Sequence, residues 1–393
     1  MTFSEIDSSE ATTDVPSDAD GLRHALLSQR QYTLALYADL PSAYWDSSQL
    51  PILATINPPL WELAHIAWFQ EFFALRWQAD DVTGSGTSSC LDVADELFDS
   101  RSVPHRSRWQ LAYPSKANCF DYMGRVLDNV IEGLVNGNSG DRAGFQLVLL
   151  HEDMHAEALA MTLTTLGIAL PSVVPRRTAP SPRCQLREIH CEGGAVKVGG
   201  SSRSFTFDNE KPGNVERLAP FEIDSRVVSA EEFAEFVSSS GYTDPSFWSV
   251  EGNTWREGEH HARAPNPMND QFYDLAAMHV NYFEASAYCR WKNRRLPTEA
   301  EWEHIATSSE EFLTSTGHVW EWTASAFSPY PGFKAERYRE YSEPWFESNG
   351  VVHQVLKGGS FVTHPRLKYP QYRNFYTPER KDMFCGFRTC AIT

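Results

Sequence analysis

A proline-rich stretch, PSVVPRRTAPSPRC, divides this chain of 393 residues into two halves whose residue patterns differ. Prolines remove backbone donors and restrict φ, so such a stretch is typical of a linker rather than of a helix or a strand. We place the linker at residues 172–188, after a helical half at 22–171 and before a mixed half at 189–393. The length suffices for two domains.

Apolar residues recur at helical spacing in four segments of the first half. The second segment begins near Asn57, which stands at a cap position with prolines in the first turn. The third opens after Ser115 and closes at Asn136–Gly137. Four amphipathic helices of this length predict a helical bundle. The segments are DGLRHALLSQRQYTLALYADL, NPPLWELAHIAWFQEFFALRWQ, SKANCFDYMGRVLDNVIEGLVNG and GFQLVLLHEDMHAEALAMTLTTLGIAL.

The second half combines short strand-like runs with two helical segments, SAEEFAEFVSSSG and FEASAYCRWKNR. The strand-like runs are AVKVGG, SFTFDN and FEIDSRVVS, and Gly, Pro and aromatic residues punctuate the loops between them. This pattern predicts a mixed α+β domain with much irregular structure. The expected fold class is therefore a helical domain followed by an α+β domain.

Composition excludes several classes of partner. Residues 1–21 carry no Lys or Arg and no apolar core, so we expect a disordered acidic tail rather than a secretory signal or a transit peptide. The net charge of −18 argues against a nucleic-acid partner, and no run approaches the roughly 20 apolar residues of a membrane span. The seven cysteines are scattered and odd in number, which favours a reducing cytoplasm.

The stretch HEDMHAEAL carries the strongest chemical signal in the first half. His151 and His155 share one helix face, about 6 Å apart, which suits two ligands of one metal ion. Glu157 is turned away from that face and is expected to act from outside the site or to pair elsewhere. His65, in an apolar segment where an unpaired ring would be costly to bury, is the best third ligand, and His105 competes for the position.

Spacing alone leaves the metal chemistry open. HEDMH matches the HExxH motif of zinc hydrolases, in which Glu152 would be the general base beside a zinc-bound water. Three imidazoles with open positions would equally suit Fe(II) that reacts with O2 and a soft ligand. The alternative for His65 is a core histidine with a backbone partner.

Four motifs in the second half, RRLPTEAEWEHIA, GHVWEWTASAF, VLKGGSF and YRNFYTPERKDMFCGFR, together resemble the formylglycine-generating-enzyme, or sulfatase-modifying-factor, fold. The resemblance implies a C-type-lectin-like α+β domain. Formylglycine generators use a cysteine pair just before the segment matching Arg373–Asn374, where this chain has none. Cys385 and Cys390 come too late, so formylglycine chemistry is not expected.

A DinB-like four-helix bundle fused to such a domain resembles the EgtB family of non-haem iron sulfoxide synthases, from about residue 22 to the end. The resemblance implies that His65, His151 and His155 bind Fe(II). It also implies that the enzyme joins a thiol to C2 of the imidazole of hercynine, the trimethylated betaine of histidine, with O2.

Departures from the ergothioneine-type pattern concern the substrates. Met154 stands where that pattern has a Gln that contacts hercynine. Asn374 matches an Asn near the trimethylammonium group, and Arg380 matches an Arg that grips the carboxylate of the thiol co-substrate. Tyr376 replaces an Asp that binds the co-substrate amine. NPPLWELAH, DSRSVPHRSRW, HEDMHAEAL and FYTPERKDMFCGFRTCA look most like the selenoneine synthase (SenA) branch, which couples hercynine to a selenosugar. The alternative is ergothioneine-type chemistry with cysteine or γ-glutamylcysteine.

The resemblance also implies a tyrosine acid from the second domain. Tyr341 is nearest the matching position, with Tyr338 and Tyr330 as alternatives. The trimethylammonium head needs aromatic faces. Phe375 and Tyr376 are candidates.

The aromatic residues Trp302, Trp320 and Trp322 are expected to be structural, although Trp320 could also face the trimethylammonium head. Three arginines precede Trp109 closely: Arg101, Arg106 and Arg108. They either hold an anionic or sugar co-substrate or form a solvated loop.

Two alternative hypotheses from other functional classes remain: a zinc hydrolase and a non-catalytic lectin-like binding module.

Overall fold

The computed structural model describes residues 14–78, 87–136, 142–178, 186–258, 275–346 and 350–392. They form two compact units. Unit 1 contains the chain up to Val174 together with two short segments from later in the sequence, Arg203–Phe205 and Val362–Leu367. Unit 2 contains Pro175–Ser202, Thr206–Phe361 and Lys368–Thr393. Two stretches from the second half of the sequence therefore fold with the first half.

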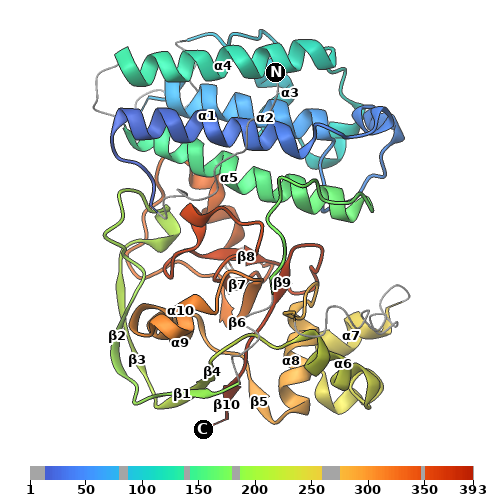
Figure 1. Ribbon diagram of the computed structural model, residues 1–393, viewed down its shortest axis with the longest axis vertical. Coiled ribbons are helices and arrows are strands. Elements are labelled where there is room, and N and C mark those ends of the chain that lie inside the picture. The colour runs from blue at the N-terminus through green and yellow to red at the C-terminus, as the bar shows by residue number, and fades with distance from the viewer. Residues whose placement is uncertain are drawn as a thin grey trace. The chain divides into compact units, whose positions relative to one another are not determined.

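Unit 1 is helical, and its four long helices lie side by side (Figure 1). Each of the four predicted helical segments forms one of these helices. Their bounds are α1 Ala19–Leu36, α2 Pro59–Glu71, α4 Lys116–Asn136 and α5 Arg142–Thr165, with a short α3 at Ala94–Phe98. Every residue of α2 is buried, including the four polar or charged residues Glu62, His65, Gln70 and Glu71. It continues as one π-helical stretch, Phe72–Arg76.

Two predictions about helix starts are wrong. The Asp18 carboxylate caps α1 by accepting a hydrogen bond from Gly21 N, and the Val15 side chain is buried. Residues 14–21 therefore belong to the folded unit, whereas the rest of the predicted tail, 1–13, lies outside the described residues. Asn57 does not cap α2, because the N-cap position is Pro58. The Asn57 side chain instead forms hydrogen bonds with Glu62 and Arg108.

The described residues of unit 2 form three small antiparallel or mixed sheets. Their strand orders are β1-β4-β10-β5, β2-β3 and β8-β7-β6-β9. The strands are β1 Glu188–Cys191, β2 Gly194–Val198, β3 Asn214–Leu218, β4 Phe221–Asp224, β5 Arg294–Arg295, β6 Trp320–Ala326, β7 Gln354–Lys357, β8 Asn374–Tyr376, β9 Cys385–Gly386 and β10 Cys390–Ala391. The helices are α6 Ala230–Ser238, α7 Val250–Glu257, α8 Tyr282–Trp291, α9 Glu299–Ser308 and α10 Glu310–Thr314.

The core of unit 2 is rich in aromatic residues with polar atoms that find partners. Trp302 and Trp322 are fully buried, and their indole N–H groups donate to Glu321 Oε2 and Val280 O, both at 2.8 Å. Trp320 is also buried, so all three tryptophans are structural as predicted. A buried indole usually finds a partner for its N–H group.

One predicted strand is absent. SFTFDN forms no strand: its last residues enter a 3₁₀ turn at Asp208–Glu210. Alternation of polar and apolar residues suggested a strand. However, the Phe207 ring packs into an aromatic cluster, 4.7 Å from Tyr341 and 5.8 Å from Tyr372 between centroids. Tertiary packing explains the alternation here, as often happens in short segments.

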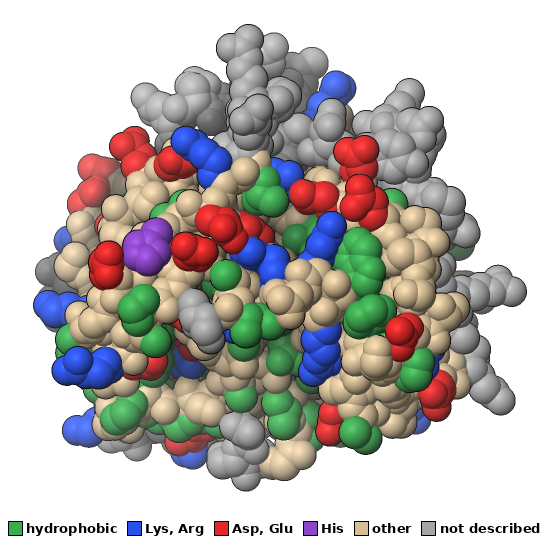
Figure 2. All heavy atoms as spheres, turned by 90° about the horizontal axis from the view of Figure 1, so that it is seen from below, with side chains coloured by type: hydrophobic (Ala, Val, Ile, Leu, Met, Phe, Trp, Pro, Cys, Tyr) green, Lys and Arg blue, Asp and Glu red, His purple; other side chains and the backbone are tan. Residues whose placement is uncertain are grey.

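The surface on the face shown in Figure 2 carries interspersed acidic and basic side chains, and its hydrophobic side chains occur in small separate groups. The described residues of that face present no broad basic field of the kind that binds a phosphate backbone. Among the described helices, none combines the length and apolar character that crossing a bilayer requires.

Candidate metal centre

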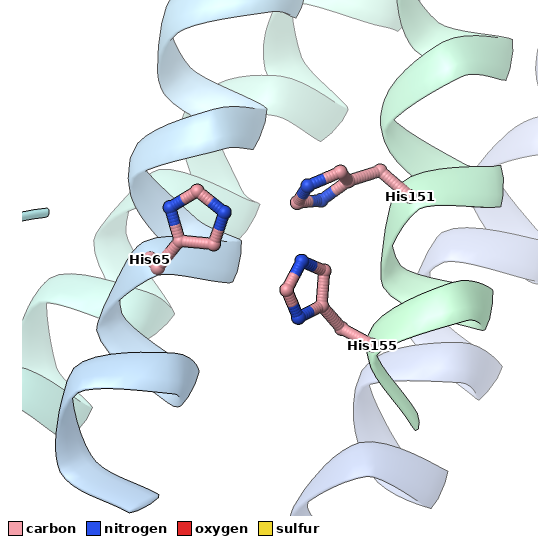
Figure 3. A group of neighbouring side chains, drawn as sticks. All are labelled: His65, His151 and His155. Carbon is pink, nitrogen blue, oxygen red and sulfur yellow. The ribbon is translucent and has the colours of Figure 1, made fainter. Parts of the chain in front are cut away.

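Three histidines meet between α2 and α5 within unit 1. His65 projects from α2, and His151 and His155 project from successive turns of α5, all toward one point (Figure 3). Ligand nitrogens of the three rings lie within 4.8 Å of one another. The ring centroids are 5.3, 5.0 and 4.3 Å apart for the pairs 65–151, 65–155 and 151–155. The arrangement is close enough for one metal ion to contact all three.

Burial favours the neutral form of two of the rings, His65 and His151. His65 and His151 are almost fully buried, and burial lowers the pKa of both well below 6.5, with the nearby His155 ring as a second cause. A neutral imidazole offers a nitrogen lone pair, which is the form that binds a metal ion. The donor set therefore fits a divalent transition metal, and imidazole suits Fe, Zn, Cu or Ni.

Hydrogen bonds fix the orientation of two of the rings. His65 Nδ1 lies 2.8 Å from Phe98 O, and His155 Nδ1 lies 2.9 Å from Glu62 Oε1. Carbonyl and carboxylate oxygens only accept, so Nδ1 carries the proton in both rings. Nε2 is then the nitrogen of each ring with the lone pair. Such partners orient metal-binding histidines in many proteins.

Aromatic side chains on α2 surround the rings. Trp61 stacks on His65 with centroids 4.8 Å apart and an interplanar angle of 7°. Phe69 stacks on His151 at 3.4 Å and 2°. The rings of His65 and His151 thus pack against apolar faces, and an apolar wall of this kind limits the access of water to a metal site.

Glu152, the glutamate of the HExxH motif, is not placed to act as a general base, because other side chains occupy its carboxylate. Glu152 is fully buried: its Oε1 accepts from Arg30 Nε at 2.8 Å, and its Oε2 accepts from Gln70 Nε2 at 2.7 Å. Arg30 in turn donates to Gln70 Oε1 at 2.7 Å. Both carboxylate oxygens are engaged in this network, which leaves neither for activation of a water. The zinc hydrolase hypothesis therefore has no general base at Glu152.

His105 does not join the cluster, because its Nε2 lies 2.8 Å from Ile56 O. Arg101, near the same loop, has a partner as well. Arg101 pairs with Asp99, at 2.9 Å from Nε to Oδ1, and its guanidinium lies 4.3 Å from the Phe72 ring centroid. The charge of Arg101 is therefore compensated within unit 1.

The other face of α5 is tied to the late segment Val362–Leu367. Asp153 accepts two hydrogen bonds from Arg366, at 2.9 and 2.7 Å, and both side chains are buried. Glu157 Oε2 accepts from Thr363 Oγ1 at 2.7 Å. Glu157 therefore pairs elsewhere, as its helical position predicted, and Met154 lies half-buried between the two turns.

The predicted substrate contacts Asn374, Phe375 and Tyr376 form strand β8 of unit 2, and all three are half-buried. Phe375 stacks on Phe327 with centroids 4.0 Å apart. Asn374 Oδ1 accepts from the backbone N of Phe375 at 2.9 Å. Successive residues of a strand point to opposite faces, so Asn374 and Tyr376 share one face and Phe375 lies on the other.

Arg380 has a partner of opposite charge. Its Nε and Nη2 donate to the two oxygens of Asp382, at 2.8 and 2.5 Å, and its guanidinium lies 4.8 Å from the Tyr376 ring centroid. Burial of the guanidinium opposes its charge, while the Asp382 carboxylate favours it, and the pKa of Arg380 is raised. Arg380 is a compensated cation rather than an isolated one.

Tyr341 forms a hydroxyl pair with Tyr372, 2.7 Å apart. Burial, with the Tyr372 hydroxyl as the second cause, raises the pKa of Tyr341 well above 10. The Tyr338 ring stacks beside it at 5.8 Å. Tyr330 is different: its hydroxyl donates to Glu299 Oε1 at 3.0 Å in the core, which assigns it a structural place.

Glu62 was missed by the sequence analysis, although a signal was present. It lies three residues before His65, close to the same face of α2, and an acid among the apolar residues of this segment requires a partner when it is buried. Tyr372 was also missed, because only the fold brings it to Tyr341.

Comparison with known proteins adds the family. Residues 176–315 and 312–392 match the family described as sulfatase-modifying factor enzyme 1-like domain, which covers more than half of the chain. The fold is thus a C-type-lectin-like domain preceded by a helical region. Formylglycine-generating enzyme from Streptomyces coelicolor is 26% identical over 54% of this chain and 91% of its own length.

Longer matches extend through the helical region. Hercynine oxygenase from Mycobacterium tuberculosis is 30% identical over 85% of this chain and 90% of its own length. The protein of the same name from Mycolicibacterium smegmatis is 29% identical, again over 85% and 90%. Ergothioneine biosynthesis protein 1 from Schizosaccharomyces pombe is 25% identical over 47% of this chain and 27% of its own length. The chain belongs to the hercynine oxygenase family.

Proposed function

We propose that this chain is an oxygen-dependent enzyme that modifies hercynine, with Fe(II) bound by His65, His151 and His155. The observation that carries the proposal is the convergence of three histidine side chains in a chain of the hercynine oxygenase family. When bound, Fe(II) supplies an oxygen-reactive redox centre with positions open for a soft chalcogen donor and for the substrate imidazole.

The proposed reaction balances with O2 as the sole oxidant. The C2–H bond of hercynine and the Se–H or S–H bond of the donor break, and a C–Se or C–S bond forms. O2 accepts four electrons. One oxygen atom enters the product as a selenoxide or sulfoxide, and the other leaves as water with the two hydrogens.

The protein's own side chains bind and orient the substrates and move protons. Asn374 and the aromatic faces of Phe375 and Tyr376 are proposed to hold the trimethylammonium head, since a quaternary cation is attracted to aromatic faces. Met154 is proposed to contact hercynine from α5. Tyr341 is proposed as the acid, and its hydrogen-bonded Tyr372 supports this role because a partner hydroxyl orients the proton.

Two observations favour a selenosugar as the donor. Tyr376 replaces the Asp that would bind an amino acid's ammonium group, and the Arg380 charge is compensated by Asp382. A polyhydroxylated donor needs neither an ammonium partner nor an isolated cation. The second candidate is sulfur transfer from cysteine or γ-glutamylcysteine, which the relative named for ergothioneine biosynthesis favours.

The deciding experiment supplies anaerobically purified, Fe(II)-loaded protein with hercynine, air and one donor at a time, followed by mass spectrometry. We expect a selenium-containing product with the selenosugar and little with the thiols. If product forms only with the thiols, the proposed donor is wrong and the enzyme transfers sulfur instead of selenium. Absence of any product in all three reactions, with iron bound, would refute the proposed function. A His151→Ala variant serves as the inactive control.

A further inference from the structure

Glu62 is a buried carboxylate in direct contact with the histidine cluster. It lies on α2, 2% exposed, with Oε1 at 2.9 Å from His155 Nδ1. Its second oxygen, Oε2, accepts from Asn57 Nδ2 at 3.1 Å. Both carboxylate oxygens are therefore engaged, and the acid has no contact with solvent that would make it a surface charge.

The chain of hydrogen bonds continues to a buried arginine. Arg108 Nη1 donates to Asn57 Oδ1 at 2.7 Å. A guanidinium only donates, so the Asn57 atom facing it must be the carbonyl oxygen, and the Asn57 amide must then donate to Glu62. Each link has one possible direction, from Arg108 through Asn57 to Glu62. The other donor to Glu62 is the Nδ1–H of His155.

Arg108 also reaches a second histidine through an aromatic ring. Its guanidinium carbon lies 3.7 Å from the Trp61 ring centroid, and the ring of His65 also stacks on Trp61. A cation at this distance from an indole is held by the ring quadrupole. Arg108 thus acts on two histidines, one through hydrogen bonds and one through stacking.

We propose that Glu62 is a positioning residue for the metal centre, and that Asn57 and Arg108 hold it in place. Glu62 keeps His155 in the tautomer with the proton on Nδ1, so that Nε2 is available to the metal ion. Glu62 also stops rotation of the His155 ring. The side chain of His155, 19% exposed, is the most exposed of the three histidines. The proposal rests on the metal site of the proposed function.

The loop arginine Arg108 accordingly has a different task from holding a substrate. It is 8% exposed and committed to Asn57 and Trp61. Outer partners of metal-binding histidines typically change metal affinity by about 10- to 100-fold when removed. The same order of effect is expected here, without any contact between Glu62 and the substrates.

The test measures Co(II) binding to the full chain without substrates, by titration against a competing chelator and by the visible absorption of bound Co(II). We expect Glu62→Ala to weaken Co(II) binding about 100-fold and to alter the absorption bands. Glu62→Gln keeps an oxygen that accepts from His155, so it should recover part of the affinity, with a loss of about tenfold. Asn57→Ala leaves the contact to His155 and should cost less than Glu62→Ala.

Glu71→Gln is the matched control. Glu71 is a buried acid on the same helix, 4% exposed, but it bonds Tyr122 and Ser89 rather than a histidine. This variant should lose thermal stability while its Co(II) affinity stays at the wild-type value. If Glu62→Ala does not fold, Glu62→Gln and Asn57→Ala carry the test, each compared with Glu71→Gln.

The outcomes separate the two proposals. Wild-type affinity in folded Glu62 and Asn57 variants would overturn the positioning role and leave the metal site intact. Equal losses in Glu62→Gln and Glu71→Gln would also overturn it, because the effect would then be one of general stability. A wild-type protein that binds no Co(II) would remove the metal site itself, and with it both proposals.

Discussion

The Arg30 guanidinium and the Glu152 carboxylate form an ion pair buried on both sides, with 2.8 Å between Nε and Oε1. Removal of one partner from such a pair leaves an uncompensated buried charge, which costs about 3–5 kcal/mol. Glu152→Ala should therefore lower the free energy of unfolding by that order in urea denaturation. A variant as stable as the wild type that loses only catalysis would restore Glu152 as a catalytic base.

Metal binding should depend on the three clustered histidines and not on His105. His65→Ala should reduce the iron content of anaerobically purified protein from about one ion per chain to background, as measured by elemental analysis, because two imidazoles hold a metal weakly. His105→Ala is the control, since His105 bonds Ile56 O. Retained iron in His65→Ala would show that the third ligand is another residue.

Tyr341→Phe should lower turnover by about 10²- to 10⁴-fold, the usual contribution of a positioned acid. The substitution keeps the ring contacts with Phe207 and Phe375 but removes the bond to the Tyr372 hydroxyl, so we expect a loss of about 1 kcal/mol in stability, with the iron content retained. Tyr330→Phe is a contrasting variant: it should lower the melting temperature through the lost bond to Glu299, with turnover retained. Full turnover in Tyr341→Phe would exclude it as the acid.

The stability of unit 2 should depend on pH through Glu210. Burial raises the pKa of this carboxyl from 4.5 to about 7. The folded state thus holds a proton that the unfolded state releases above pH 4.5. This contribution to stability is complete below pH 4.5 and disappears as pH rises to about 7, with a slope of at most about 1.4 kcal/mol per pH unit.

Glu210→Gln mimics the protonated form and keeps an oxygen to accept from Tyr369. The variant should be more stable than the wild type at pH 8 and close to it at pH 4.5, as followed by urea denaturation at both values. A stability difference that does not change with pH would contradict the raised pKa.

Arg366 should be important for the stability of α5. Arg366→Ala leaves the buried Asp153 without its bidentate partner, so we expect a loss of about 3–5 kcal/mol in the free energy of unfolding. Hydrogen exchange should show faster exchange of the α5 amides. Exposed Arg106 in the basic loop provides a control, because Arg106→Ala should leave exchange in α5 unchanged.

The sequence predicted structure well where the helical repeat alone decides which side chains share a face. The four-residue step from His151 to His155 fixed their shared face, and the apolar surroundings of His65 pointed to a partner on α5. It failed where distant residues decide. Asn57 has the local signature of a cap, yet Arg108, 51 residues later, draws its side chain into another role.

Other features lie beyond any local pattern. Tyr341 and Tyr372 are 31 residues apart, and no periodicity relates their hydroxyls. Polar and apolar residues alternate in SFTFDN as they do in a strand, but the segment forms no strand because Phe207 packs into an aromatic cluster. The substrate-binding roles proposed for Asn374 and Arg380 rest on a family resemblance, and the chemistry of these two side chains alone would not have suggested them.

The pairing of α5 with Val362–Leu367 also limits how this protein can be divided. Thr363 and Glu157 are 206 positions apart in sequence, yet they belong to one compact unit. A fragment severed after Val174 would keep all three histidines but lose the partners of Asp153 and Glu157 from the same helix. We therefore expect that the helical region does not fold stably by itself, and that transplanting it onto another protein requires both late segments of unit 1, Arg203–Phe205 and Val362–Leu367.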